Sequence, residues 1–351
     1  MVVRPFIRQQ FLKFYRLIKG ANFISKVTNE SFVAPQFQLK FKKIQMKKIL
    51  LSVVALLTTI VTYSQCACCA GVGIGATNGD YNNGILTLPK KMFVIETYSD
   101  YRTIKKGDAP EMDEKLLTNM RINSIGVRYG ITKRLTVSAM IPYVSLNTND
   151  GSDSGFGDLI LLGTYSIYQK NNLNFAIQGG IKLPTGIQKD SNFDDSTIII
   201  GSGSYDPMAG ILASKKWNKI TLNTNVLYKK ANPGFENNYY GSLSTQNLTL
   251  SYKIKGETAI CSLDENDKKP KTNFGLTANL GYTGEWLDML KENDIVDENS
   301  GHYLGLANLG ATFSYKKWAI PVNFSEPFIN HMNGMQNNFG FRFRIGIIRA
   351  F

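Results

Sequence analysis

Polar and apolar residues alternate along most of the chain from about residue 92 to the end. In the last segment, one face of an extended strand carries only large apolar residues (Phe339, Phe341, Phe343, Ile345 and Ile347). The opposite face carries Arg342 and Arg344 between glycines. Because successive side chains of a strand point to opposite sides, one face suits lipid and the other suits water. The pattern predicts β-strands with two chemically different faces.

Turn and loop residues divide this pattern into twelve expected strands. They cover residues 92–103, 119–130, 134–145, 156–168, 173–183, 205–215, 219–230, 245–255, 274–285, 303–315, 318–324 and 338–350. Short turns are expected at 131–133, 169–172, 216–218 and 316–317, and longer polar segments at 104–118, 146–155, 184–204, 231–244, 286–302 and 325–337. Segment 256–273 is long where a short turn is expected.

This sorting of connections by length separates two kinds of β-protein. A soluble barrel has no reason to place its short connections at one end. Outer-membrane barrels have short periplasmic turns, longer extracellular loops and usually an even number of strands. The expected fold is therefore all-β, a transmembrane antiparallel up-and-down β-barrel of about twelve strands at residues 92–351, located in the bacterial outer membrane.

The segment before the barrel has the pattern of a secretion signal. Met46, Lys47 and Lys48 precede an apolar run at 49–61, which is too short to span a bilayer but suits a signal peptide. We predict a signal peptide at 46–64, with Gln65 as the new N-terminus. Residues 1–45 are then an upstream basic segment, interpreted either as a misassigned start or as a long basic leader.

The net charge of +13 does not indicate a nucleic-acid partner. Residues 1–45 hold nine Lys or Arg against one acidic residue, and Lys47 and Lys48 follow. Only three of the thirteen net positive charges therefore lie beyond residue 64. No basic stripe with interleaved aromatic residues occurs there. The expected partners are outer-membrane lipid, a small-molecule permeant and the machinery that inserts barrels, which would read the terminal Phe351.

Two motifs are more specific than the alternation. Residues 179–186 read GGIKLPTG, and residues 201–211 read GSGSYDPMAGI. The motif residues of interest are Lys182, Leu183, Pro184, Thr185, Gly186, Gly201, Gly203, Tyr205, Asp206 and Pro207. Both motifs resemble the outer-membrane family named for the meta pathway of phenol degradation. The residues themselves are interpreted as architectural, since Pro184 ends a strand and Gly186 permits a turn.

The resemblance implies a channel or transporter for passive passage of small, often hydrophobic molecules across the outer membrane. The alternative is a structural or surface-interaction barrel whose extracellular loops bind a partner. A twelve-stranded barrel encloses a narrow lumen, and Arg128, Lys182, Arg342 and Arg344 are expected to face it. They would attract anions mildly, although pairing with carboxylates of neighbouring strands is the stronger expectation.

The N-terminal part of the mature chain raises two further hypotheses. Residues 65–91 are rich in glycine and asparagine, and we hypothesise that they fold inward as a plug; a disordered periplasmic tail is the alternative. Cys66, Cys68 and Cys69 lie in this segment, and Cys261 lies in the unusual connection 256–273. A disulfide between Cys261 and one of the three is expected, with a soft-metal site as the rival interpretation.

The sequence does not predict an enzyme or a cofactor. Acyl-transfer chemistry needs a histidine that reaches a nucleophilic serine and is oriented by a third polar group. The two histidines, His302 and His331, are both expected in extracellular loops. Paired acids such as Asp194 and Asp195 lie among glycine and serine, which favours a solvated role.

Overall fold

The structure is a computed structural model of the 351-residue chain, and it describes residues 86–105, 107, 117–148, 151–190, 197–256 and 274–351. The chain divides into two units, Met1–Thr59 and Ile60–Phe351, and every described residue belongs to the second. The predicted upstream segment, the signal peptide, most of the glycine-rich segment and all four cysteines lie outside the described residues.

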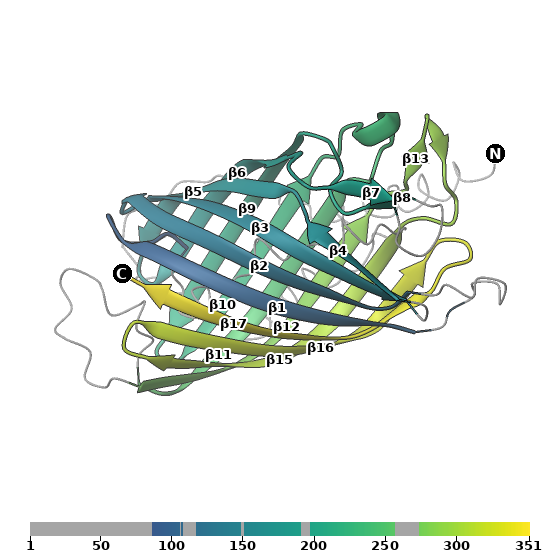
Figure 1. The fold of residues 1–351 in the computed structure, drawn as a ribbon. Coiled ribbons are helices and arrows are strands. Elements are labelled where there is room, and N and C mark those ends of the chain that lie inside the picture. The colour runs from purple at the N-terminus through teal and green to yellow at the C-terminus, as the bar shows by residue number, and fades with distance from the viewer. Residues whose placement is uncertain (1–85, 106, 108–116, 149–150, 191–196, 257–273) are drawn as a thin grey trace, which may run out of the picture. The chain divides into compact units, whose positions relative to one another are not determined.

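Twelve strands close into one antiparallel barrel (Figure 1). They are β1 (Phe93–Lys105), β2 (Leu117–Thr132), β3 (Leu135–Thr148), β5 (Leu159–Lys170), β6 (Leu173–Leu183), β9 (Asp206–Trp217), β10 (Ile220–Lys229), β11 (Leu243–Lys255), β12 (Phe274–Leu287), β15 (His302–Tyr315), β16 (Trp318–Met332) and β17 (Asn338–Ala350). The first strand, β1, pairs with both β2 and the last strand, β17, which closes the ring. The expected all-β barrel of twelve strands is confirmed.

The wall of the barrel is apolar outside and largely polar inside. Ile211, Leu280 and Leu309, on three different strands, are 63%, 61% and 65% exposed. On β10 the alternate positions Asn223 and Asn225 are buried. A protein in water would hide the apolar face, so this distribution fits a wall surrounded by lipid. Among the described residues, no helix is long and apolar enough to cross a membrane.

Short turns lie at one end of the barrel. Asn171 and Asn172 join β5 to β6 with φ angles of 53° and 57°, the left-handed geometry that a two-residue hairpin needs. Asn218 and Lys316 have positive φ in the turns after β9 and β15. Apart from the connection between β11 and β12, the long connections lie at the other end. They contain the short elements β7 (Gln188–Asp190), β8 (Thr197–Ile199), η1 (Phe235–Asn237), β13 (Lys291–Glu292) and β14 (Ile295–Val296).

Two expected loops prove to be partly strand. Segment 146–155 is mostly a hairpin, because β3 continues to Thr148 and pairs with β4 (Ser152–Phe156). Segment 325–337 is strand as far as Met332, because β16 stays paired with β15 and a bulge leaves Phe328 outside the register. Pro327 and its polar neighbours favoured a loop in the sequence. Both histidines consequently lie in strands, His302 on β15 and His331 on β16, and not in loops.

The last strand contains a second irregularity. Its register against β1 shifts between Arg102 and Ile104, which pair with Arg342 and Phe339. The shift turns Phe339 away from the lipid face and into a buried cluster with Leu304 and Leu306. The expectation that Phe339 shares the face of the other apolar residues of β17 is therefore wrong, because a bulge inverts the alternation at this point.

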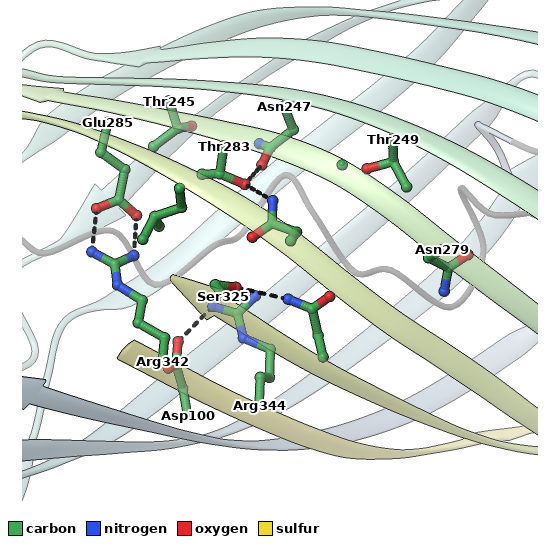
Figure 2. Close-up of a pocket in the computed structure, with 14 residues that line it drawn as sticks. Asp100, Thr245, Asn247, Thr249, Asn279, Thr283, Glu285, Ser325, Arg342 and Arg344 are labelled. Atoms are coloured by element: carbon green, nitrogen blue, oxygen red, sulfur yellow. Dashed lines mark hydrogen bonds and ion pairs between the residues drawn. The ribbon is translucent and has the colours of Figure 1, made fainter. Parts of the chain in front are cut away.

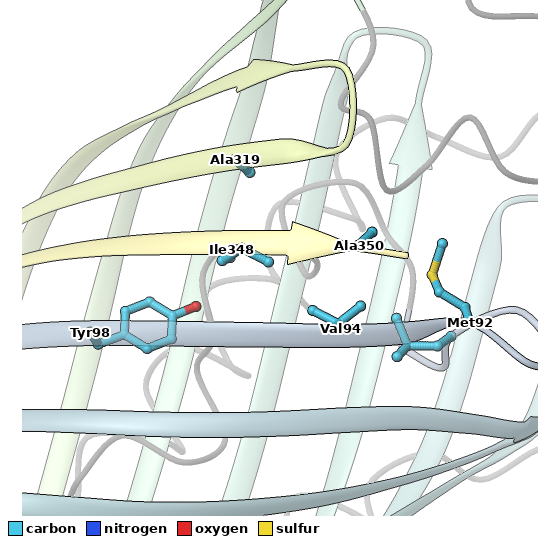
Figure 3. Close-up of a cluster of buried hydrophobic side chains, with 7 residues drawn as sticks. Met92, Val94, Tyr98, Ala319, Ile348 and Ala350 are labelled. Atoms are coloured by element: carbon cyan, nitrogen blue, oxygen red, sulfur yellow. The ribbon is translucent and has the colours of Figure 1, made fainter.

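Residues 86–92 lead into β1 and pack against inward-facing side chains. Leu88 belongs to a buried cluster with Val94, Ile348 and Ala350, part of which is visible in Figure 3. Its main-chain N–H donates to Thr136 Oγ1 at 2.7 Å. These contacts place the end of the glycine-rich segment inside the short-turn end of the barrel.

The exposed apolar face gives a direct test of membrane embedding. Replacing Ile211, in the middle of β9, with arginine is expected to lower the folding free energy by about 2–4 kcal/mol, the cost of arginine on a lipid face at mid-membrane. The control is Ile220→Arg at the short-turn end of β10, where a cost of about 0–1 kcal/mol is expected. Urea titration in lipid vesicles measures both. Equal costs would contradict this placement of the membrane.

Candidate functional site

The two sequence motifs meet around one buried carboxylate, that of Asp158. This residue follows Gly157 at the break between β4 and β5, which lie in line along β3. Asp158 Oδ2 accepts hydrogen bonds from the backbone N–H and the hydroxyl of Ser202, both at 2.8 Å. Asp158 Oδ1 accepts from the N–H of Gly186 at 2.9 Å. The side chain of Asp158 thus links the end of the first motif to the start of the second.

Lys182 completes this cluster from the end of β6. Its ammonium group lies 2.8 Å from Asp158 Oδ2 and 2.9 Å from Asp206 Oδ2, and it also donates to Ser202 Oγ. The side chains of all three ionised residues are less than 10% exposed. Lys229 lies 3.7 Å from the same oxygen of Asp206. Two carboxylates and two ammonium groups therefore balance each other in the wall.

Glycines permit the close approach of the two motif loops. A Cβ on Gly186 would lie 2.5 Å from the Cα of Gly201, and a Cβ on Gly201 would meet Gly186 equally closely. Gly203 has a φ of 69°, and its missing side chain leaves room for the ring of Phe235. Larger residues at these three positions would push the loops apart or strain the backbone.

The remaining motif residues end or begin strands. Leu183 pairs with Leu159 at the end of β6, and Pro207 pairs with Ile181 at the start of β9. Thr185, after Pro184, accepts a hydrogen bond from the N–H of Leu159 at 2.8 Å. Tyr205 is exposed. We name the whole arrangement of Asp158, Lys182, Gly186, Gly201, Ser202 and Asp206 the motif junction.

The connections after β10 and β12 also pack together. Tyr239 donates a hydrogen bond to Asp288 Oδ2 at 3.1 Å and exchanges main-chain hydrogen bonds with Lys291 at 2.8 and 2.9 Å. Burial raises the pKa of the Tyr239 hydroxyl, so the hydroxyl keeps its proton at neutral pH and can donate. The hydrogen bonds of Tyr239 therefore link the connections that follow β10 and β12, just as the motif junction links β6 and β9.

A polar cavity of about 50 Å³ lies inside the barrel wall (Figure 2). Side chains from β1, β11, β12, β15, β16 and β17 line it, and we call it the central cavity. Its lining consists of Asp100, Thr245, Asn247, Thr249, Asn279, Gly281, Thr283, Glu285, Leu306, Asn308, Asn323, Ser325, Arg342 and Arg344. Leu306 is the one large apolar residue in this lining. The walls offer mainly amides, hydroxyls and ion pairs.

The charged groups of the central cavity are paired with each other. Arg342 makes a bidentate ion pair with Glu285, at 2.6 and 2.8 Å, as seen in Figure 2. Two strands, β15 and β16, separate the strands that carry these partners, so the pair crosses the inner face of the wall. Arg344 lies 2.6 Å from Asp100, its register partner on β1. The lining holds two cations and two anions, which gives no net charge.

Of the four cations expected to face the lumen, each lies against a carboxylate. Arg128 is 3.1 Å from Glu96, and Lys182, Arg342 and Arg344 have the partners given above. A further arginine, Arg102, is fully buried and lies 3.0 Å from Asp100. Sequence reasoning missed the carboxylates that complete these pairs. Alternation could have identified Glu96 and Asp100, which share a face of β1.

No described group of three or more His, Cys, Asp or Glu residues could hold a metal ion. The soft-metal interpretation and the disulfide both concern cysteines outside the described residues. Neither is tested.

The closed barrel defines the class of the protein: it is an outer-membrane β-barrel. Within that class, the chain belongs to the family described as MetA-pathway of phenol degradation, whose model matches residues 117–317, more than half of the chain. This confirms the resemblance of the two motifs. A sequence search of curated proteins finds no match.

One solved structure shares the fold, and two others are more distantly similar. The COG4313 outer membrane channel from Pseudomonas putida F1 superposes with a TM-score of 0.54 and 16% identity, covering 78% of this chain and 98% of the channel. The NanC porin gives a TM-score of 0.40 and 12% identity over 73% of this chain and 98% of the porin. The TodX monoaromatic hydrocarbon channel gives a TM-score of 0.39 and 9% identity, covering 78% of this chain and 93% of the TodX chain.

Proposed function

We propose that the protein is an outer-membrane channel for passive passage of small molecules. The observation that carries this proposal is the central cavity, which lies within a closed barrel and is lined by polar side chains from six strands. A barrel that served only as a structural anchor would gain little from an interior site lined by hydrogen-bonding groups. Family membership supports the same function, since the family's description refers to the breakdown of a small organic compound.

The alternative function, a barrel whose outer loops bind a partner, has less support. The long connections do pack on each other, through Tyr239 and the motif junction. These contacts are internal and require no partner. We also infer that the protein is not an enzyme, because His302 is buried against the ring of Phe339 at 5.0 Å and the solved structure with a TM-score of 0.54 is described as a channel.

We also propose roles in this channel for the N-terminal segment and for the last residue of the chain. Residues 65–85 would continue the path of residues 86–92 and narrow the lumen, tethered through Cys261. Phe351 would be read by the insertion machinery. Its ring is exposed, lies 5.9 Å from the ring of Phe93 and stacks under the guanidinium of Arg349 at 4.6 Å, at the short-turn end where such a signal would be presented.

Ion conductance of the full-length protein tests the proposed function. The protein, extracted from outer membranes of an expressing strain, is expected to give stable single-channel currents in a planar bilayer. The recording is repeated after reduction of disulfides, where a tethered N-terminal segment predicts a larger current. Preparations that are fully folded, as judged by their heat-dependent mobility on gels, but give no current in either state would refute an ion-permeable channel.

A further inference from the structure

We propose that the central cavity is a binding site for small, uncharged, hydroxyl-rich molecules, that is, polyols. This inference rests on the proposed channel function, because it names the chemical class of solute that the channel would recognise. The evidence comes from the supply of hydrogen-bonding groups, the state of the charged groups and the size of the cavity.

The hydrogen-bonding groups of the cavity are mainly neutral, and they include both donors and acceptors. Four asparagines and four hydroxyl residues line it. Some are linked in a chain, in which Asn308 donates to Thr283 Oγ1 at 2.9 Å and Thr283 donates to Asn247 Oδ1 at 2.7 Å. Amides and hydroxyls each offer donors and acceptors. They match a ligand whose own groups also donate and accept, as hydroxyl groups do.

Asn279 provides the second, independent observation. Its side chain is more than nine-tenths buried and lines the cavity, where Figure 2 shows it. Its Nδ2 donates to Thr312 Oγ1 at 3.5 Å, but its Oδ1 has no hydrogen-bond partner within the part of the chain that the structure describes. A buried polar atom without a partner costs free energy. This oxygen has almost no exposed surface, so a ligand hydroxyl would reach it after a small rotation of the Asn279 side chain, and the new bond would remove the cost.

The arginines of the cavity do not favour an anionic ligand. Both terminal nitrogens of Arg342 already bond Glu285, and Arg344 bonds Asp100. A carboxylate or phosphate would meet arginines whose charge Glu285 and Asp100 already balance, so it would bring an uncompensated negative charge into the lining. An apolar ligand is disfavoured for a different reason, because it would cover the amides without satisfying them.

The size of the cavity indicates a small ligand. A volume of about 50 Å³ on this measure holds about four water molecules, which occupy roughly 120 Å³ as liquid. That volume is close to that of a three-carbon polyol. Glycerol, lactate and 1-propanol are therefore suitable probes, because they have nearly the same size and differ in charge and in the number of hydroxyl groups.

Binding is measured by saturation-transfer NMR on the full-length protein in detergent micelles. Glycerol is expected to show saturable binding in the millimolar range and to bind more tightly than lactate or 1-propanol. Asn279→Leu is expected to weaken glycerol binding by about three- to tenfold, the effect of one lost hydrogen bond. The matched control is Gln178→Leu, which removes a buried amide of β6 that does not line the cavity and should leave the affinity unchanged.

Several results would overturn the proposal. Tighter binding of lactate would show that the arginines determine recognition, and tighter binding of 1-propanol would show that the site is apolar. Equal glycerol affinity in the wild type, the Asn279→Leu variant and the control would exclude the cavity. If Asn279→Leu does not fold, Asn308→Leu takes its place. Conductance without glycerol binding would leave the channel function intact, whereas glycerol binding without conductance would refute only the channel.

Discussion

The Asp158→Ala variant is expected to lose about 3–5 kcal/mol of folding free energy. The substitution removes one of the two carboxylates that surround the buried ammonium group of Lys182. The backbone N–H groups of Gly186 and Ser202 lose their acceptor as well. Urea titration in lipid vesicles, followed by gel mobility, measures the loss.

The control for this prediction is Glu292→Ala, which removes an exposed acid from the β13–β14 hairpin and should change the stability by less than about 0.5 kcal/mol. Proteases should also cut the connection between β6 and β9 faster in Asp158→Ala, since the motif junction holds its two ends. Equal stability and equal protease resistance of the two variants would show that the junction is not needed for the fold.

The Glu285→Gln variant is expected to shift ion selectivity towards anions. In the wild type the lining of the central cavity has no net charge, and the substitution gives it a charge of one positive unit. Arg342 would then lose its carboxylate partner, while Arg102 and Arg344 both lie against Asp100. The reversal potential in a salt gradient measures the shift, and stability should fall by about 3 kcal/mol because a buried arginine loses its partner.

The double variant Glu285→Gln, Arg342→Gln is the matched control. It restores electrical neutrality and places two groups that can hydrogen-bond each other across β15 and β16. Its reversal potential should return to the wild-type value. A shift that persists in the double variant would indicate that geometry, and not charge, determines the selectivity.

The fold could be predicted from the sequence because a membrane barrel repeats one simple rule. Each expected strand from 92–103 to 338–350 has a counterpart in the barrel, since alternation survives on every strand that separates lipid from the interior. The errors occur where a strand extends beyond the lipid. The hairpin after Tyr143 contains a run of polar residues and glycine, and Pro327 and a bulge interrupt the alternation near the end of β16. Neither stretch is therefore distinguished from a loop by its sequence.

The sites were less accessible to sequence reasoning, because their partners are distant along the chain. Asp158 looked like an ordinary polar residue near the start of an expected strand. Its role depends on Lys182 and Ser202, which different strands and loops bring to it. Likewise, Glu285 and Arg342 meet only because β12 and β17 curve towards each other across the inner wall. A linear pattern identifies the face of each residue but not its partner across the lumen.

The pairing of β1 with β17 has a consequence for biogenesis. Asp100 and Arg344 touch although 244 positions separate them along the chain, so this ladder can form only after β17 has been synthesised. Contacts between such remote segments carry a large loop-closure entropy and slow the folding of β-proteins. Until then the first and last strands expose unpaired edges that invite aggregation. Shortening β17 should therefore lower the yield of folded protein more than shortening any of the long connections.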